Sequence, residues 1–201
     1  NIRGAFKRQG EKSIMIKYKL KENPIETFSF NYIEDYLKNL GIEKTSSFLE
    51  KPSPEDEEHY SRLDNIERAI DKLHESFINN KKIFLQVDSD ADGFTSSAIF
   101  YAFFKRVFPN ANIEYRLHDG KEHGVIVDTI PIDADVVVIP DAGSMQFDEQ
   151  EEISKSGRPM IILDHHKVEN PPEFEGVILV NNQSSKNFEN KFLSGAGVVY
   201  K

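Results

Sequence analysis

The feature that most constrains this chain is a series of short apolar runs, separated by helix-like segments, that begins at residue 82. The runs "KIFLQV", "DVVVI", "MIIL" and "GVILV" are apolar along nearly their whole length rather than at every second residue. Continuous apolar strands that alternate with helices are typical of a parallel sheet covered on both faces. The sequence therefore predicts an α/β fold, with an open, mainly parallel, Rossmann-like sheet of about five strands and helices on both faces.

The remaining elements of this region follow from periodicity and from breaking residues. The run "ANIEYRL" supplies another strand, and the dense apolar pattern of 93–108 predicts a largely buried helix that Pro109 ends. A further helix is expected at 147–157. Apolar residues recur at helical spacing from Leu63 to Phe77, which predicts an amphipathic helix leading into the first strand.

The first 60 residues differ in composition from the rest. Residues 1–21 hold seven lysines and arginines against one acid, a local charge of +6 that leaves −15 for the remainder. A short helix ending near Gly41 and an acidic, proline-bearing linker should follow. We therefore expect a small N-terminal segment, 1–60, ahead of a main domain, 61–201. The basic arm has two open interpretations, a solvated terminus or a binding site for phosphates.

Composition excludes several classes of site and location. The chain has no cysteine, so disulfides and thiolate metal sites are impossible, which is compatible with the cytoplasm. It has no apolar run near the ~20 residues that span a bilayer and no signal-peptide pattern. We therefore expect a cytoplasmic protein with no membrane partner. Because the first residue is Asn, we also expect the sequence to be a fragment.

Three of the predicted strands end in acidic or imidazole side chains. The endings are "DSDADG", "PDAGS" and "DHH", at residues 88–93, 140–144 and 164–166. In an open parallel sheet, ligands bind beyond the carboxyl ends of the strands, so the three endings should converge on one place. The side chains concerned are Asp88, Asp90, Asp92, Asp141, Asp164, His165 and His166.

Carboxylates brought together repel one another and resist ionisation unless a cation neutralises them. Oxygen donors with imidazole suit Mn²⁺ or Mg²⁺, and two such ions about 3.5–4 Å apart can activate water and stabilise phosphoryl charge. Each motif alone also has a plainer interpretation. "DSDADG" resembles a calcium loop or a capped turn, Asp141 could be a turn former, and His165 could be structural. Their shared position at strand ends favours the metal site.

The order and spacing of these three endings resemble the DHH phosphoesterase family. The segment "LSGAGVVYK" at 193–201 and the helix before the first ending are similar to the RecJ-like branch, whose members are single-strand-specific 5′→3′ exonucleases. The resemblance covers about residues 60–201. It implies phosphodiester hydrolysis with two Mn²⁺ or Mg²⁺ ions, a single-stranded nucleic acid substrate, and a role in DNA repair and recombination.

The resemblance also assigns metal ligands residue by residue. It implies that Asp90 and Asp141 hold the first ion. It implies that Asp92, Asp141 and His165 hold the second, so that Asp141 bridges the two. Asp88 fits the first acidic position of the motif and would assist the metal site.

The resemblance also implies roles for the histidine pair and Asp164, and at one position this chain departs from the family's pattern. His166 would contact the scissile phosphate or protonate the leaving oxygen, and Asp164 would orient the histidine pair. The family usually has a histidine ligand of the first metal two residues before the first aspartate, where this chain has Gln86. An amide oxygen is a poorer ligand for Mn²⁺, so a weak first site is expected.

Contacts to phosphate are predicted at two further places. Ser96 lies in the first turn of the helix that follows the first ending, where N–H groups favour anions. Gly195 and Gly197 would allow close backbone approach, or would form an ordinary turn before a helix. Lys7 and Arg8 of the basic arm are candidates for contacting the nucleic acid backbone.

Three functions remain open at this point. The first is a RecJ-like exonuclease on single-stranded DNA, for which single-strand-binding or replication proteins are candidate partners. The second is a phosphodiesterase of oligonucleotides or cyclic dinucleotides, and the third is a non-catalytic replication or repair scaffold. The resemblance further implies that the last metal aspartate and a C-terminal DHH-associated domain lie beyond Lys201.

Overall fold

The computed structural model describes residues 32–51, 53, 56–120 and 122–201. The chain divides into two compact units, residues 1–54 and 55–201, whereas the predicted division lies at 60 and 61. In its described part the first unit has two short helices, α1 (Tyr32–Asn39) and α2 (Thr45–Leu49). The first is the predicted helix, and the second was not predicted.

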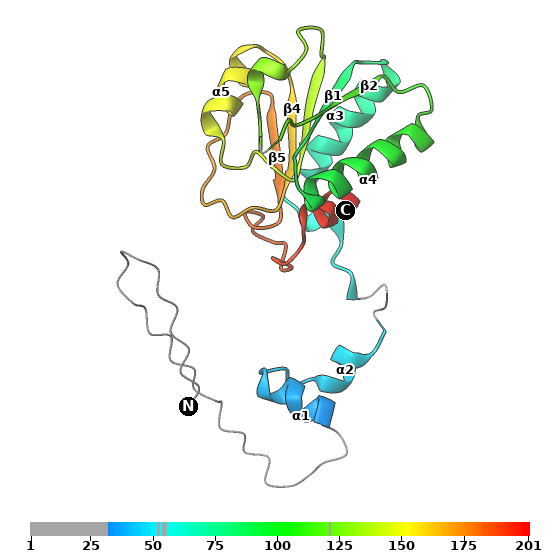
Figure 1. The fold of residues 1–201 in the computed structure, drawn as a ribbon, viewed down its shortest axis with the longest axis vertical. Coiled ribbons are helices and arrows are strands. Elements are labelled where there is room, and N and C mark those ends of the chain that lie inside the picture. The colour runs from blue at the N-terminus through cyan, green and yellow to red at the C-terminus, as the bar shows by residue number, and fades with distance from the viewer. Residues whose placement is uncertain (1–31, 52, 54–55, 121) are drawn as a thin grey trace, which may run out of the picture. The chain divides into compact units, whose positions relative to one another are not determined.

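The second unit contains one five-stranded sheet, shown in Figure 1. Its strands lie in the order β2-β1-β3-β4-β5, and every neighbouring pair is parallel. The predicted open parallel α/β sheet is therefore confirmed. The bounds of the strands are β1 (Ile83–Val87), β2 (Ile113–Leu117), β3 (Val136–Pro140), β4 (Met160–Asp164) and β5 (Val177–Asn181).

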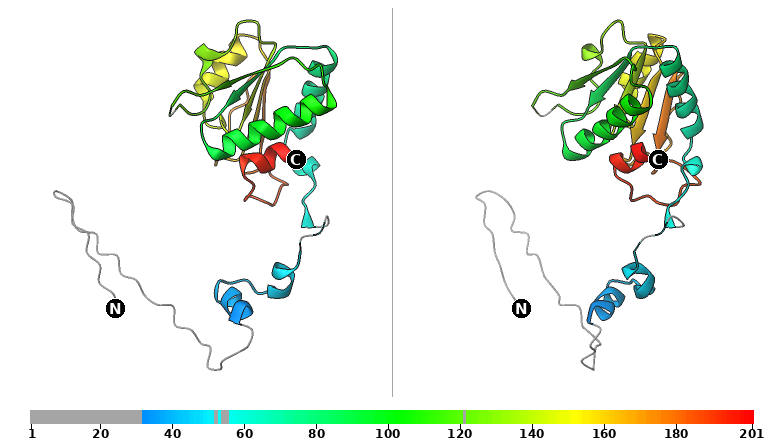
Figure 2. Two further views of the ribbon diagram at one scale, coloured as in Figure 1. Left: turned by 45° about the vertical axis from the view of Figure 1, so that its right-hand side comes forward. Right: turned by 90° about the vertical axis from the view of Figure 1, so that its right-hand side faces the viewer.

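Helices cover both faces of this sheet, because alternate side chains of each strand enter two separate cores. On β3, Val136 and Val138 pack into one core, and Val137 and Ile139 into the other. The helices of the first core include α3, α4 and α6, and α5 closes the second core on the opposite face (Figure 2). Their bounds are α3 (Ile66–Ile78), α4 (Ala91–Val107), α5 (Phe147–Lys155) and α6 (Gly195–Tyr200), with 3₁₀ turns at Tyr60–Arg62 and Val127–Thr129.

Two helices begin at residues of the motifs identified in the sequence. Asp90 is the N-cap of α4, and its carboxylate accepts a hydrogen bond from Gly93 N at 2.8 Å. Ser194 is the N-cap of α6 and accepts one from Gly197 N at 3.2 Å. Helix α6 packs against α4, so "DSDADG" and "LSGAG" lie side by side although they are far apart in sequence.

The strand order determines where a ligand can bind. The chain runs from β1 outward to β2 and then crosses to β3 on the other side of β1. Such a reversal opens a crevice at the carboxyl ends of the two central strands. Asp88 directly follows β1 and Asp141 directly follows β3, so both predicted ligands lie at the carboxyl ends of these two adjacent strands.

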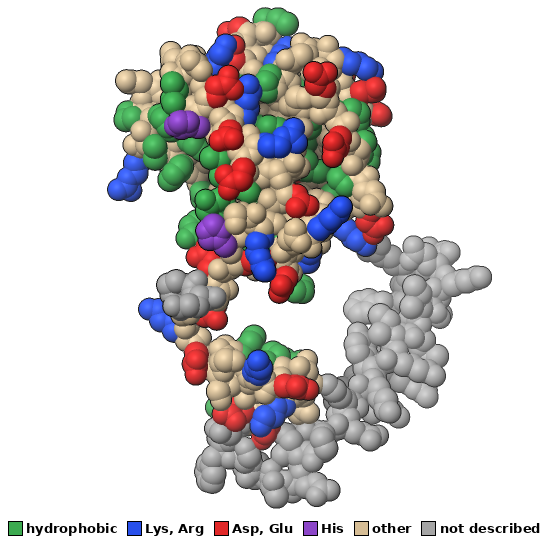
Figure 3. All heavy atoms as spheres, turned by 180° about the vertical axis from the view of Figure 1, so that it is seen from behind, with side chains coloured by type: hydrophobic (Ala, Val, Ile, Leu, Met, Phe, Trp, Pro, Cys, Tyr) green, Lys and Arg blue, Asp and Glu red, His purple; other side chains and the backbone are tan. Residues whose placement is uncertain are grey.

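The surface in Figure 3 carries acidic and basic side chains interspersed over the second unit, without a large region of one sign on that face. Among the residues that the structure describes, no helix is both long and apolar enough to cross a membrane.

Candidate metal centre

Asp141 occupies the centre of the site and has an unusual environment. The residue has a left-handed backbone conformation, with φ of 65°, and only 1% of its surface is exposed. Neither of its carboxylate oxygens has a hydrogen-bond partner among the described residues. Burial raises the pKa of Asp141 to about 8, and the negative charges of Asp92 and Asp90 add to this effect. A buried carboxylate without donors is poorly solvated unless a cation binds it.

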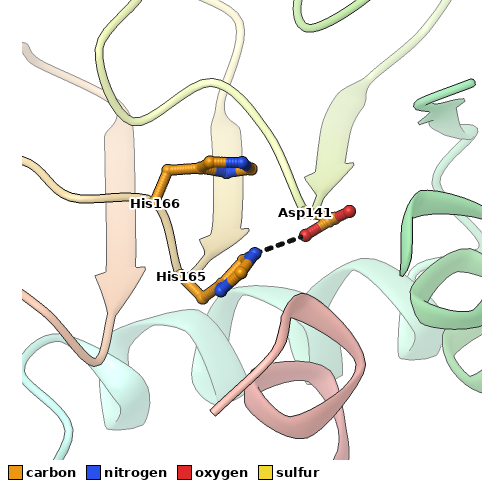
Figure 4. Close-up of side chains that lie close together, drawn as sticks. All are labelled: Asp141, His165 and His166. Carbon is orange, nitrogen blue, oxygen red and sulfur yellow. Dashed lines mark ion pairs between the residues drawn. The ribbon is translucent and has the colours of Figure 1, made fainter. Parts of the chain in front are cut away.

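His165 and Asp92 flank this carboxylate on one side. His165 Nε2 lies 3.2 Å from Asp141 Oδ1 and 3.5 Å from Asp92 Oδ2, and Figure 4 shows its ring directed at Asp141. The two Asp92 oxygens accept hydrogen bonds from Gly195 N at 2.7 Å and Ala196 N at 2.9 Å. Burial alone would raise the pKa of Asp92, but these N–H donors outweigh it and lower the pKa. Asp92 is therefore a well-held anion beside Asp141.

Gly195 has a role that the sequence interpretation did not anticipate. A Cβ at this position would overlap the carboxylate of Asp141 and lie 2.6 Å from its Cγ. A glycine is therefore required for the start of α6 to approach Asp141 while its N–H group binds Asp92. The predicted close approach to phosphate at Gly195 stays a prediction, because the observed close approach is to a carboxylate.

A second group of potential ligands shares Asp141. Oxygens of Asp88, Asp90 and Asp141 all lie within 4.8 Å of one another. Atoms of Asp141, His165 and His166 form another such group. Two clusters that meet at one buried carboxylate match the arrangement in which an aspartate bridges two ions.

The separations of the ligand atoms test whether a cation fits. Ligands at right angles on an ion with bonds of about 2.1 Å lie roughly 3 Å apart. The observed separations around His165, 3.2 and 3.5 Å, are close to this value. The donor set of carboxylates and imidazole, with the bare oxygens of Asp141 at its centre, therefore fits divalent cations such as Mn²⁺ or Mg²⁺.

Asp164 stands at the end of β4 and holds the histidine pair. Its Oδ1 accepts hydrogen bonds from the backbone N–H groups of His165 and His166, at 2.7 and 3.1 Å, and from His166 Nδ1 at 2.8 Å. Burial alone would raise the pKa of Asp164, but the hydrogen bonds from His166 and Ser144 outweigh it and lower the pKa to about 2. The bond to Asp164 raises the pKa of His166 to about 9. The pair is thus an anion and a cation at neutral pH.

Two residues that the sequence did not suggest support this pair. Ser144 N donates to Asp164 Oδ2 at 3.0 Å. Asn181 Nδ2 donates to Ser144 Oγ at 2.8 Å and to the carbonyl of His166 at 2.9 Å. Ser144 lies in the loop after β3 and Asn181 ends β5, the strands on either side of β4. Their position at strand ends is the one feature of the sequence that could have indicated them.

Three predicted residues have other surroundings. The Gln86 side chain is 1% exposed, and its amide contacts the carbonyl of Ile126 and Thr129 Oγ1 while its oxygen accepts from Ile126 N. These contacts link β1 to the segment before β3, so its role as a weak metal ligand stays a prediction. Ser96 is fully buried inside the fold, and Gly197 N–H is occupied by Ser194. Lys7 and Arg8 lie outside the described residues.

Comparison with known proteins identifies the family to which this site belongs. The model of the DHH family, N-terminal domain, matches residues 82–201. The chain belongs to the DHH family. The matched region includes every residue of the metal centre described above, as well as the Asp164–His166 pair.

Two proteins named as exonucleases are similar in sequence to most of this chain. YorK, a proposed SPbeta prophage-derived single-strand DNA-specific exonuclease of Bacillus subtilis (strain 168), is 48% identical over 174 residues, which are 87% of this chain and 30% of YorK. The single-stranded-DNA-specific exonuclease RecJ of Escherichia coli (strain K12) is 28% identical over 147 residues, 70% of this chain and 25% of that protein. The chain therefore spans less than a third of the length of either relative.

A solved structure agrees in fold. The crystal structure of an exonuclease RecJ bound to manganese superposes with a TM-score of 0.60 and 25% sequence identity, over 69% of this chain and 36% of that one. The DHH-family assignment therefore rests on sequence and on fold together.

Proposed function

We propose that this protein is a metal-dependent hydrolase of phosphodiester bonds and acts as a 5′→3′ exonuclease on single-stranded DNA. The observation that carries the proposal is the carboxylate of Asp141. It is buried, lacks hydrogen-bond donors within the described part of the chain, and is shared by two groups of potential ligands. Such a carboxylate is stable as an anion only with cations on it, and two adjacent cations are suited to phosphoryl chemistry.

We assign one divalent ion to each side of the Asp141 carboxylate. Asp88, Asp90 and Asp141 would hold the first ion. Asp92, Asp141 and His165 would hold the second, in which the N–H groups at the start of α6 keep Asp92 in place. Imidazole favours Mn²⁺ over Mg²⁺, so we expect Mn²⁺ to be preferred.

When bound, two such cations lower the pKa of water and stabilise negative charge that develops on phosphoryl oxygens. The protein's own groups do the remaining work. His166 has a pKa raised to about 9 by Asp164, so it is protonated at neutral pH and can donate a hydrogen bond or a proton to an oxygen of the phosphate. Asp164 accepts from both backbone N–H groups of the histidine pair and so maintains the direction of the rings.

The names of the relatives support the choice of substrate. Both YorK and RecJ are described as specific for single-stranded DNA, and the RecJ structure is described as bound to manganese. Because this chain spans less than a third of either relative, substrate, polarity and a role in DNA repair or recombination are proposed for it by this likeness.

The test is hydrolysis of end-labelled substrates. The protein is incubated with 5′- and 3′-labelled single-stranded DNA, RNA and dinucleotides, each with Mn²⁺, Mg²⁺ or a chelator. We expect mononucleotides to be released from 5′ ends of DNA, faster with Mn²⁺, and not at all with chelator. Asp141→Asn should be inactive. Asp133→Asn is the matched control. Asp133 lies before β3, at the opposite end from Asp141, and its exposed carboxylate pairs with Lys82.

Other outcomes would replace the proposal with a different one. Hydrolysis of dinucleotides alone would indicate a small-substrate phosphodiesterase. Equal and complete inactivity of the wild-type protein and Asp141→Asn would contradict an enzymatic role.

A further inference from the structure

His123 lies beside the metal centre, in the loop that connects β2 to β3. Its Nδ1 is 3.1 Å from Asp88 Oδ2, and 60% of its side chain is exposed. The loop is fastened to the end of β1 by two more bonds, from Gly124 N to Asp88 Oδ1 at 2.7 Å and from Ser89 Oγ to the carbonyl of Glu122 at 2.6 Å. The imidazole of His123 is therefore held next to a residue of the first ligand group.

The neighbouring histidine, His118, is excluded from such a role by its contacts. Its side chain is fully buried, and its Nε2 donates to the carbonyl of Gly124 at 2.7 Å. Its Nδ1 faces Arg116 Nη1 at 3.0 Å. Both ring nitrogens are thus engaged within the loop. Although His118 Nε2 lies 3.8 Å from Asp88 Oδ1, its hydrogen bond goes to the Gly124 carbonyl, so His118 fixes the loop that presents His123.

A salt link closes the same loop from the other side. Arg116 Nη2 pairs with Glu122 Oε2 at 3.0 Å, and this carboxylate also accepts from Asp119 N at 2.9 Å. With the bond between His118 and Gly124, the loop has support on both arms. The hydrogen bonds of the loop thus fix the position of the His123 imidazole, while its ring stays accessible to an ion from solution. A metal ligand needs both properties.

The distance between His123 and Asp88 suits two ligands of one cation. Adjacent ligands at bonds of about 2.1 Å lie roughly 3 Å apart, and the observed separation is 3.1 Å. The same relation holds for His165 and Asp141 at the other ion, where the separation is 3.2 Å. His165 is itself a member of the second group, whereas His123 contacts the first group through one member, Asp88, at its solvent-exposed side.

We propose that His123 is the imidazole ligand of the first metal ion, bound through Nδ1 alongside Asp88, Asp90 and Asp141. The inference rests on the metal site of the proposed function and adds a ligand to it. On binding, Nδ1 gives up its hydrogen bond to Asp88 and the imidazole carries its proton on Nε2. A nitrogen ligand replaces a purely carboxylate site by one that favours Mn²⁺ over Mg²⁺.

The direct test is NMR of the protein labelled with ¹⁵N-histidine and titrated with ¹¹³Cd²⁺, a diamagnetic probe for the site. We expect a scalar coupling between ¹¹³Cd and Nδ1 of His123, a second coupling at His165, and none at His118. Assignment comes from the loss of one signal in His123→Gln. If Nδ1 of His123 keeps its proton with two equivalents of ¹¹³Cd²⁺ bound, the residue only positions Asp88 and the inference is overturned.

A second measurement uses Mn²⁺ itself, with the free ion counted by EPR. Wild-type protein should bind two ions, and His123→Ala should bind one of them about 10- to 100-fold more weakly, with a smaller loss for Mg²⁺. His74→Ala is the matched control, because His74 is an exposed histidine on α3 that faces Phe108. Unchanged affinity for both ions in His123→Ala would contradict the inference.

These readouts separate the two proposals. Coupling at His123 in a protein that hydrolyses no DNA would support the ligand and contradict the nuclease. Absence of any bound ¹¹³Cd²⁺ or Mn²⁺ would overturn the metal site and the ligand together. Two bound ions without coupling at His123 would overturn the ligand alone.

Discussion

The ends of β3 and β4 carry two buried carboxylates in opposite environments. Asp141 has no hydrogen-bond donor among the residues that the structure describes, and its pKa is raised to about 8 by burial and by neighbouring acids. Asp164 is equally buried, but donors from His165, His166 and Ser144 surround it and outweigh burial, so its pKa is lowered to about 2. The described residues leave the first carboxylate without hydrogen-bond donors, whereas they surround the second with donors. Asp141 is therefore the proposed metal ligand, whereas Asp164 holds the histidine pair in place.

The largest expected effect concerns Asp141→Asn. Loss of the shared ligand should lower the single-turnover rate with Mn²⁺ by at least about 10³-fold, because several kcal/mol of charge stabilisation depend on the ions. In chelator, the free energy of unfolding in urea should be unchanged or higher, because the folded protein no longer has to hold a carboxyl whose pKa is raised to about 8 by burial. A variant that is active, or one that is strongly destabilised in chelator, would contradict the contrast with Asp164.

Asp164→Asn should behave in the opposite way. It leaves the Ser144 N–H and the His166 ring without a charged acceptor, so we expect the free energy of unfolding in chelator to fall by about 2–3 kcal/mol. Urea unfolding under the conditions used for Asp141→Asn measures it. A loss below that of Asp141→Asn would mean that the donors around Asp164 contribute little to the fold.

Gly195→Ala tests whether the close approach of α6 to Asp141 is needed for metal binding. The added Cβ would meet Asp141 at 2.6 Å from Cγ, which forces the start of α6 away and displaces the N–H groups from Asp92. We expect Mn²⁺ binding to weaken by about 10- to 100-fold. Gly197→Ala is the matched control, because its Cβ would lie 3.2 Å from Leu193 Cβ, a tight contact that a small shift relieves, and has no contact with Asp141. Equal effects of the two substitutions would refute the close-approach argument.

The smallest expected effect is on the pH dependence of the free energy of unfolding. It is measured in chelator, by comparing the wild-type protein with His166→Gln. The pKa of His166 is about 9 in the fold and about 6.5 when unfolded, so the folded protein binds the extra proton between these values. The stability that His166 adds is therefore complete below about pH 6.5 and is lost as the pH rises through 9. The gap between the two proteins should be about 1 kcal/mol or less, since the ring is more than half exposed. A gap that widens toward pH 9 would contradict the assignment.

Much of the fold and part of the site could be predicted before any coordinates. The apolar runs predicted all five strands, and the position of acidic residues after three of them predicted their convergence. His123 was missed, since its contact with Asp88 depends on the conformation of the loop that follows β2. Ser144 and Asn181 were missed for the same reason, because hydrogen bonds between adjacent loops leave no periodic pattern in the sequence.

What the sequence determined by itself is the parallel sheet and the edge at which its polar residues gather, because strand burial and chain reversal follow from local hydrophobicity and connectivity. The tertiary structure alone decided which hydrogen-bond donors surround each carboxylate at that edge. Asp141 and Asp164 are both aspartates at strand ends, and they differ in the hydrogen-bond donors that neighbouring segments bring to them, so that Asp141 is the proposed metal ligand and Asp164 holds the histidine pair. The physical reason is that the free energy of a buried charge depends on the groups packed around it, which the order of residues along the chain does not specify.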